Sequence, residues 1–380
     1  MLAPGRMRTP SSFSQVSSLL RVGLAAVSVA LPLSDARARE ARKTHAEMVL
    51  DVIDGHVIPR LEQLRDATER LTSDLKSLCA DPGDAGLRRR VEERFGDVVG
   101  FWGTIDFVRF GPLAEASRLE RFFFWPDPRA VTERQLLALL ARRDPALLEP
   151  GSLASQSAAV QGLGAIEFIA YNGKLPLGGP DEDAQYRCAF AAAIAANLEA
   201  IARDVATGWT APHGWRAKML SPGSDNPIYK DASETAREVV KTLLTGLQIA
   251  QDRHVSPRLE AATADPPKRV RMPFERSNSS ARYLEQELRS LAALFDATGL
   301  ADYVPPDKVW MKAFIARSFQ SLVADVAILP WPVRSEPVDE KGLATLRKMR
   351  FNLNGLRQII NRELAPAAGL VLGFNELDGD

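Results

Sequence analysis

The spacing of apolar residues is the feature that most restricts the fold of this 380-residue chain. Between His45 and Leu78, apolar side chains recur every three or four positions, which is the period of a helix with one buried face. The same period returns in most of the chain, and no convincing run of alternating strand pattern appears. The sequence therefore predicts an all-α fold of helical bundles with a large shared core. The further expected helices are 84–110, 133–142, 151–171, 183–209, 233–259, 279–298, 307–327 and 341–362.

One seven-residue segment occurs twice. His56-Val-Ile-Pro-Arg-Leu-Glu62 and His254-Val-Ser-Pro-Arg-Leu-Glu260 match at six of seven positions. Both copies lie late in a long apolar helix, and each contains a proline that should kink it. The match favours two helical-bundle domains related by duplication. Because residues 211–230 are rich in proline and glycine, we place the boundary there, with domains at 39–215 and 216–380.

The N-terminus has the pattern of a secretory signal peptide. Arg6, Arg8 and Arg21 give it a positive charge, and residues 22–33 form an apolar core too short to span a bilayer comfortably. Ala36-Arg37-Ala38 supplies a small-x-small cleavage site. We therefore expect a signal peptide at 1–38, cleavage after Ala38, and a periplasmic protein that is not transmembrane after cleavage.

Composition and charge narrow the range of partners. Hydrophobic residues make up 46% and charged residues 25%, as in ordinary globular proteins, and the formal net charge is +0. This balance gives no electrostatic reason to expect nucleic acid as a partner. Cys79 and Cys188 are the two cysteines. An oxidising compartment would let them pair, and the alternative is two separate buried thiols.

Several reaction classes have little support. The sequence contains no Gly-x-Ser-x-Gly elbow, no P-loop and no His-Glu-x-x-His zinc motif. Among the four histidines, His56 and His254 would meet as metal ligands if the two repeats packed about a pseudo-two-fold axis. The alternative is that each supports its proline kink by bonding a freed backbone carbonyl.

Glu167 is the strongest single candidate for a binding residue. It lies in a largely apolar helical segment, where a carboxylate is expensive to bury without a partner. The partner would be a cation, a substrate amine or an arginine, and Arg109 is such an arginine. A ligand site and a structural Arg–Glu pair are both open.

Two further acidic residues are candidates. Asp127, in Trp125-Pro126-Asp127, would be a helix cap or a ligand, and the cap is the favoured interpretation. Asp378 belongs to an acidic, oxygen-rich C-terminus that would hold a hard cation, or would simply be solvated.

Several of these segments together resemble the imelysin family of exported bacterial proteins. They occur in the family's order and cover roughly residues 44–380. The matching segments are Trp102 with Arg109-Phe-Gly-Pro112, Phe124-Trp-Pro-Asp127, Ser157–Phe168, Met272-Pro-Phe-Glu-Arg-Ser277 and Gly373-Phe-Asn-Glu-Leu-Asp-Gly-Asp380.

The resemblance implies two bundle domains related by duplication, a cleft near the motif helix, an envelope location and a link to iron uptake. Some members are described as metallopeptidases, with the His and Glu of a Gly-x-His-x-x-Glu motif as metal ligands. In this chain Gly164 replaces that histidine, and Glu167 matches the glutamate.

We therefore expect a periplasmic binding protein of iron acquisition with a ligand cleft bordered by Glu167 and Arg109. Its ligand would be a divalent metal, iron or a small molecule, and its partners would be other iron-uptake proteins of the envelope. The alternatives are a metal-dependent peptidase of the imelysin type and a purely structural interaction protein of the envelope.

Overall fold

The computed structural model describes residues 42–173, 177–331 and 338–372. In these ranges the chain forms helices and loops and no strand, which confirms the all-α prediction. None of the described helices combines the length and apolar character that a membrane crossing needs. The expected signal peptide and Asp378 lie outside the described residues.

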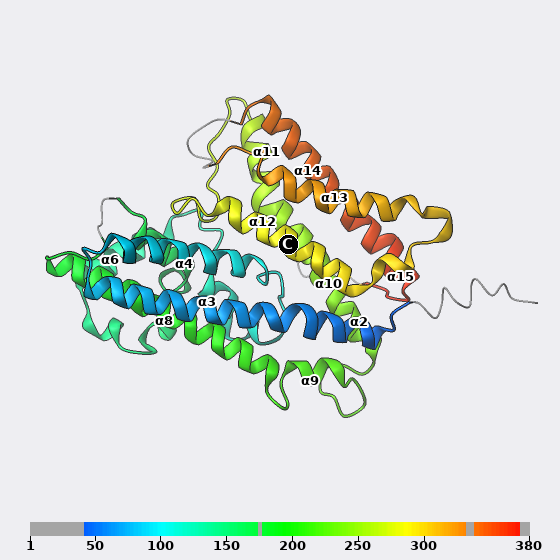
Figure 1. Cartoon of the computed structure of the whole chain (residues 1–380), viewed down its shortest axis with the longest axis horizontal. Coiled ribbons are helices and arrows are strands. Elements are labelled where there is room, and N and C mark those ends of the chain that lie inside the picture. Colours follow the sequence, from blue (N-terminus) through cyan, green and yellow to red (C-terminus); the bar gives the residue numbers. More distant parts are fainter. Residues whose placement is uncertain (1–41, 174–176, 332–337, 373–380) are drawn as a thin grey trace, which may run out of the picture. The chain divides into compact units, whose positions relative to one another are not determined.

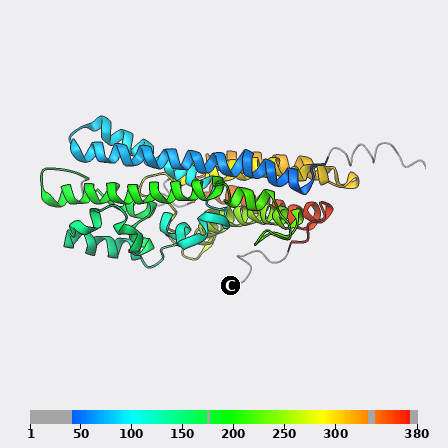
Figure 2. The same cartoon turned by 90° about the horizontal axis from the view of Figure 1, so that it is seen from below.

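Three long helices form the core of the N-terminal half. They are α3 (Ile58–Ala80), α4 (Ala85–Gly103) and α8 (Glu182–Thr210), and α3 packs along both of the others (Figures 1 and 2). The apolar face of α3 is buried, as the helical period predicts. Asp84 begins α4 by accepting hydrogen bonds from two backbone N–H groups of the first turn. Shorter helices complete this half: α2 (His45–Val52), α5 (Arg118–Phe122), α6 (Val131–Arg142) and α7 (Leu163–Ala170).

A disulfide joins Cys79 on α3 to Cys188 on α8, with a Cα–Cα distance of 5.5 Å. Of the two alternatives that the sequence left open, the disulfide is therefore confirmed. It links positions 109 residues apart and fixes α3 against α8 near the end of α3.

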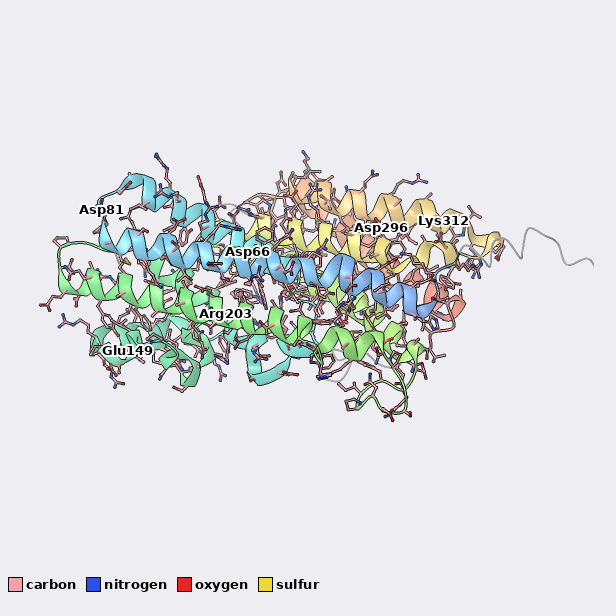
Figure 3. All side chains as sticks on the ribbon, turned by 60° about the horizontal axis from the view of Figure 1, so that its bottom comes forward. Asp66, Asp81, Glu149, Arg203, Asp296 and Lys312 are labelled. Atoms are coloured by element: carbon pink, nitrogen blue, oxygen red, sulfur yellow. A yellow bond between two sulfur atoms is a disulfide. The ribbon has the colours of Figure 1, made fainter. Side chains whose placement is uncertain are left out.

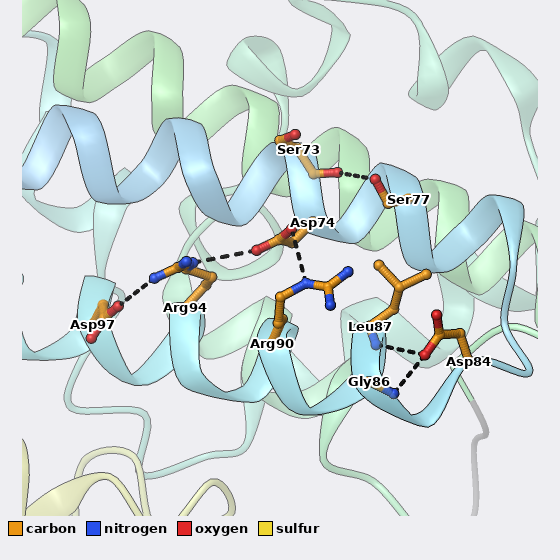
Figure 4. A network of polar contacts seen from close by, with 9 residues as sticks. All are labelled: Ser73, Asp74, Ser77, Asp84, Gly86, Leu87, Arg90, Arg94 and Asp97. Atoms are coloured by element: carbon orange, nitrogen blue, oxygen red, sulfur yellow. Dashed lines mark hydrogen bonds and ion pairs between the residues drawn. The ribbon is translucent and has the colours of Figure 1, made fainter.

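Charged residues cover the outer helix faces, where Arg203, Asp296 and Lys312 are exposed (Figure 3). One network crosses from α3 to α4: Arg94 lies between Asp74 and Asp97, with N–O distances of 3.3 Å to each (Figure 4). These groups are partly exposed, so each pair contributes little to stability, on the order of 1 kcal/mol or less.

The C-terminal half packs directly on the first. Helix α10 (Ala232–Ala250) contacts α2, and α12 (Ser280–Thr298) contacts both α2 and α4. The division of the chain into domains 39–215 and 216–380 stays a prediction. The other helices of this half are α9 (Trp215–Leu220), α11 (Ser256–Thr263), α13 (Trp310–Val326), α14 (Glu340–Ile359) and α15 (Ala365–Ala367).

Within the described residues, π-helical segments interrupt three of the long helices, and each ends two residues before a proline. In each, the residue before the proline donates its N–H to the carbonyl five residues back. A proline has no N–H and its ring collides with the carbonyl four residues back, so the wider turn relieves both problems. The segments are η1 (Ile53–Val57) before Pro59, η7 (Gln251–Val255) before Pro257, and η10 (Ile360–Leu364) before Pro366.

Both copies of the repeated sequence thus adopt the same local structure. The third segment lacks the repeat's histidine but has the same proline spacing. Because the proline alone accounts for the shared geometry, the duplication stays a prediction.

Candidate functional site

The motif helix α7 begins after Gly162, which has an extended backbone with no room for a side chain. A Cβ at Gly162 would lie 2.6 Å from the carbonyl oxygen of Phe122 and 2.8 Å from that of Arg121. This close approach ends the continuous helix expected over 151–171. Two 3-10 turns, Ser152–Ser155 and Ala158–Val160, take the place of its first half.

Gly164, the residue in the place of the motif histidine, has a different environment. A Cβ at this position would meet no atom within 4 Å. Packing therefore does not require a glycine here. The position offers neither a side-chain ligand nor a steric barrier beside Glu167.

Glu167 is buried, with 8% of its surface exposed, and its partner is Ser277. Its Oε1 accepts hydrogen bonds from the Ser277 backbone N–H at 3.0 Å and from the Ser277 hydroxyl at 2.8 Å. Burial raises the pKa of the Glu167 carboxyl, and the two bonds from Ser277 act in the opposite direction. Within the described part of the chain, no hydrogen bond or ion pair joins Glu167 to Arg109.

The segment of residues 271–277 is fastened to the N-terminal half at further points. Arg276 Nη2 lies 3.0 Å from Glu133 Oε2 on α6, and its guanidinium lies 5.0 Å from the ring centre of Phe168 on α7. Phe274, which has a left-handed φ of 55°, stacks on Phe123 at 4.3 Å. The segment is therefore held by side chains from α6, from α7 and from the loop that follows α5.

Asp127 caps α6. Its Oδ1 accepts from Val131 N at 2.7 Å and its Oδ2 from Thr132 N at 3.0 Å. These are N–H groups of the first turn, which have no partner inside the helix. The N-cap of α6 is Ala130, without a side-chain bond of its own, so Asp127 serves the start of this helix from three residues before the cap position. The Asp127 backbone carbonyl also faces Arg271, whose Nη1 lies 3.4 Å away.

A cavity of about 530 Å³ opens between the loop of residues 125–128, the π-helical segment η7 and residues 269–271. Among the described residues, Asp127 is the one predicted site residue in its wall, and Glu167 and Arg109 do not line it. Glu167 reaches this cavity indirectly, through the segment that continues from Arg271 to Ser277. The lining residues are Trp125, Pro126, Asp127, Pro128, Asp252, Arg253, Pro257, Arg269, Val270 and Arg271.

Arg109 lies elsewhere, in a small cavity of about 60 Å³ that Lys241 and Thr245 also line. Its Nε is buried and makes no hydrogen bond within the described chain. The structure therefore places the two residues of the expected cleft, Glu167 and Arg109, in separate surroundings.

A buried ionic cluster lies behind the large cavity and was missed by the sequence analysis. Arg253 Nη1 donates to Asp106 Oδ2 and, at 2.6 Å, to Tyr283 Oη; Tyr283 also donates to Asp106. Next to them His254 Nε2 lies 3.3 Å from Glu287 Oε2, with both side chains fully buried. The one available signal was a lone aspartate in the apolar segment Ile105-Asp106-Phe107.

Burial sets the protonation of this cluster. It lowers the pKa of His254 to about 3, with the charges of Arg253 and Arg258 acting in the same direction. It also raises the pKa of Glu287 well above its ordinary value. At neutral pH the imidazole of His254 is therefore uncharged, and burial favours the protonated form of its neighbour Glu287.

His56 has other partners. Its Nε2 lies 3.2 Å from Ser290 Oγ, whose own proton goes to the Thr104 carbonyl at 2.8 Å. Because a hydroxyl has one proton, His56 Nε2 must be the donor in this contact. His56 thus bonds to a side chain of α12, whereas His254 only lies close to one. In the described ranges, no group of three or more His, Cys, Asp or Glu side chains is arranged to hold a metal ion.

The fold and the motif helix define a helical-bundle protein in which a buried glutamate connects distant segments of the chain. The family model for imelysin, also described as peptidase M75, matches residues 57–358. This chain therefore belongs to the imelysin family.

Two solved structures share its fold. An imelysin-like protein from Psychrobacter arcticum 273-4 aligns with a TM-score of 0.71 and 18% identity, over 88% of this chain and 99% of that one. An iron-regulated protein A precursor from Parabacteroides distasonis ATCC 8503 aligns with a TM-score of 0.56 and 11% identity, over 84% and 96%. No curated protein is significantly similar.

Proposed function

We propose that this protein is an exported, periplasmic binding protein of iron acquisition and not a peptidase. The cavity between residues 125–128 and 269–271 carries the proposal, because its volume of about 530 Å³ lies in the range of small-molecule sites. Support for the iron link comes from the name of the Parabacteroides distasonis relative, an iron-regulated protein A precursor. Other iron-uptake proteins of the envelope would receive the ligand.

The role of Glu167 in this proposal is to position the cavity wall. Its carboxyl group holds Ser277 by two hydrogen bonds, and Ser277 ends the segment that begins at Arg271 in the cavity. Loss of these bonds would release the segment at one of the points where it is held. Glu167 thus acts on the ligand through the backbone of residues 271–277.

The residues of the motif helix do not fit the metal that this motif is described to hold in other family members. Gly164 supplies no ligand atom, and the Glu167 carboxyl is buried and already accepts two bonds from Ser277. We therefore assign no catalytic step to this helix.

The test combines binding and cleavage measurements on the mature chain, residues 39–380. Calorimetric titrations with ferrous, ferric, cupric and zinc salts and with ferric citrate would be paired with casein digestion, with and without a chelator. We expect binding of an iron-containing probe and no chelator-sensitive cleavage. Glu167→Ala should weaken that binding more than it lowers the unfolding temperature, because it releases residues 271–277.

Glu285→Ala is the matched control, because Glu285 is a partly exposed glutamate of α12 that pairs only with Arg289 in the described chain. It should leave binding unchanged. Chelator-sensitive cleavage that disappears in Glu167→Ala would establish the peptidase instead. A chain that binds none of the probes would favour a structural role in the envelope.

A further inference from the structure

We infer that the cavity between residues 125–128 and 269–271 recognises a small organic anion, in which an acidic group is attached to an apolar or aromatic body. This inference names the ligand class of the proposed binding site, and only its connection with iron rests on the proposed function. Three arginines from two segments, Arg253, Arg269 and Arg271, line the same cavity.

Arg253 is the fixed group of the three. Its side chain is only 16% exposed, and Asp106 and Tyr283 both bind its Nη1. These contacts hold the guanidinium in one orientation, while its Nε and Nη2 make no hydrogen bond within the described chain. A guanidinium fixed in this way loses little entropy when it binds a ligand, and its fork of donors matches a carboxylate or phosphate.

Arg269 and Arg271 supply the positive charge. Both are exposed, and in the described part of the chain neither forms an ion pair with an acidic side chain. Arg271 is oriented by its contact with the Asp127 backbone carbonyl, which leaves its charge uncompensated.

The two acidic residues of the cavity wall, Asp127 and Asp252, already have partners within the protein. The Asp127 carboxylate accepts the N–H groups of Val131 and Thr132, and the positive end of α6 offsets its charge. Asp252 is partly buried, which raises its pKa, and Gln248 and Arg357 stabilise its ionised form. An incoming anion would therefore meet arginines with free donor groups, whereas a bare cation would meet uncompensated positive charge.

The rest of the wall is apolar. Trp125 is stacked in parallel with Phe123 at 6.0 Å, and prolines 126, 128 and 257 and Val270 complete the surface. A ligand that consisted of an acidic group alone would leave this apolar surface exposed to water. A ligand with an aromatic or aliphatic body would cover it, and an iron-carrying ligand would have to be an anionic chelate.

Calorimetry on the mature chain tests the inference with three probes of similar shape: benzoate, phenyl phosphate and the uncharged benzyl alcohol. We expect at least one of the two anions to bind and benzyl alcohol to bind at least tenfold more weakly. The double variant Arg269→Gln/Arg271→Gln should lose about tenfold or more in affinity for the anion, since a hydrogen bond to a charged group contributes about 1.5–3 kcal/mol. Added salt should weaken anion binding in the same direction.

Arg203→Gln is the matched control, because Arg203 is an exposed arginine on the outer face of α8 (Figure 3). It should bind the anion like the unchanged chain. The inference is overturned if the double variant binds the anion equally well, or if benzyl alcohol binds as tightly as benzoate. Circular dichroism would verify that the exposed substitutions leave the fold intact.

Citrate and ferric citrate separate this inference from the proposed function. If both bind equally and both depend on Arg269 and Arg271, the anion site stands and the role in iron acquisition fails. If ferric citrate binds with unchanged affinity in the double variant, the iron role stands and the anion site is refuted.

Discussion

The two copies of the repeated sequence share a local structure and differ in everything around it. Each histidine, His56 and His254, lies in a π-helical segment that ends two residues before a proline. His56 donates to a neutral serine, Ser290, whereas His254 faces Glu287 beside the buried pair of Asp106 and Arg253.

The arginines of the two copies differ in the same way. Arg60 is half-buried and bonds to Ser290 at 3.0 Å and to the His56 carbonyl at 3.1 Å. Arg258 is fully buried, donates to the Pro330 carbonyl and stacks on Trp331 at 4.6 Å. Burial lowers the pKa of Arg258 to about 10.

This contrast teaches which properties follow from local sequence. The proline sets the π-helical turn, because its effects reach only the preceding carbonyls. The side chains that face the two histidines, Ser290 and Glu287, come from α12, which is distant in sequence from both copies. The second copy also borders the large cavity through Pro257, and Arg253, the residue directly before this copy, belongs both to the cavity wall and to the polar cluster.

The largest expected effect comes from removing each histidine in turn. His254→Ala should lower the free energy of unfolding by about 3–5 kcal/mol, because it leaves a cavity and an unpartnered Glu287 in the core. His56→Ala should lower it by about 1–3 kcal/mol, because Ser290 keeps its bonds to Thr104 and Arg60. Urea unfolding at pH 7 measures both, and equal losses would contradict the contrast between the two copies.

Much of the fold was predictable because it depends on short-range patterns. The helical period placed the long helices, and Asp127 was correctly linked to the start of a helix because its partners are four and five residues away, although the N-cap itself is Ala130. The helix over 151–171 was wrong in its first half, because the backbone of Arg121 and Phe122 closes on Gly162 from a distant part of the chain.

The candidate site was less predictable because its contacts are long-range. Glu167 was correctly identified as a buried carboxyl that needs a partner, but Ser277 lies 110 residues further along the chain. Arg109 was expected beside Glu167, but it lies in a separate small cavity that Lys241 and Thr245 also line. The cluster around Asp106 joins residues up to 177 positions apart, and no local pattern reports such a contact.

Removal of the disulfide tests whether the N-terminal and C-terminal halves unfold independently. Because Cys79–Cys188 closes a loop of over a hundred residues, the double variant Cys79→Ser/Cys188→Ser should lose about 2–4 kcal/mol of stability. The loss should appear mainly as faster hydrogen exchange in α3 and α8, and much less in α10 and α12. Equal changes in all four helices would mean that the halves unfold as one unit.

The smallest effect is the pH dependence that His56 introduces. Burial, together with the charge of Arg60, lowers the pKa of His56 to about 3 in the folded chain, against about 6.5 when unfolded. As the pH falls below 6.5, the unfolded chain binds a proton that the folded chain does not. The unchanged protein should therefore lose up to about 1.4 kcal/mol per pH unit from this group, and His56→Asn should not.

Urea unfolding between pH 7 and 5 gives the free energy of unfolding of the unchanged protein and of His56→Asn. As the pH falls, the unchanged protein should lose more stability than the variant. Glu287 titrates with the opposite sign: its raised pKa gives stability that is present below about pH 4.5 and is lost as the pH rises. That contribution is the same in both proteins and cancels. In His254→Asn it does not cancel, because Glu287 has lost its neighbour, so that variant should show a different slope. Identical slopes for the two variants would show that the surroundings of the two histidines are electrostatically equivalent.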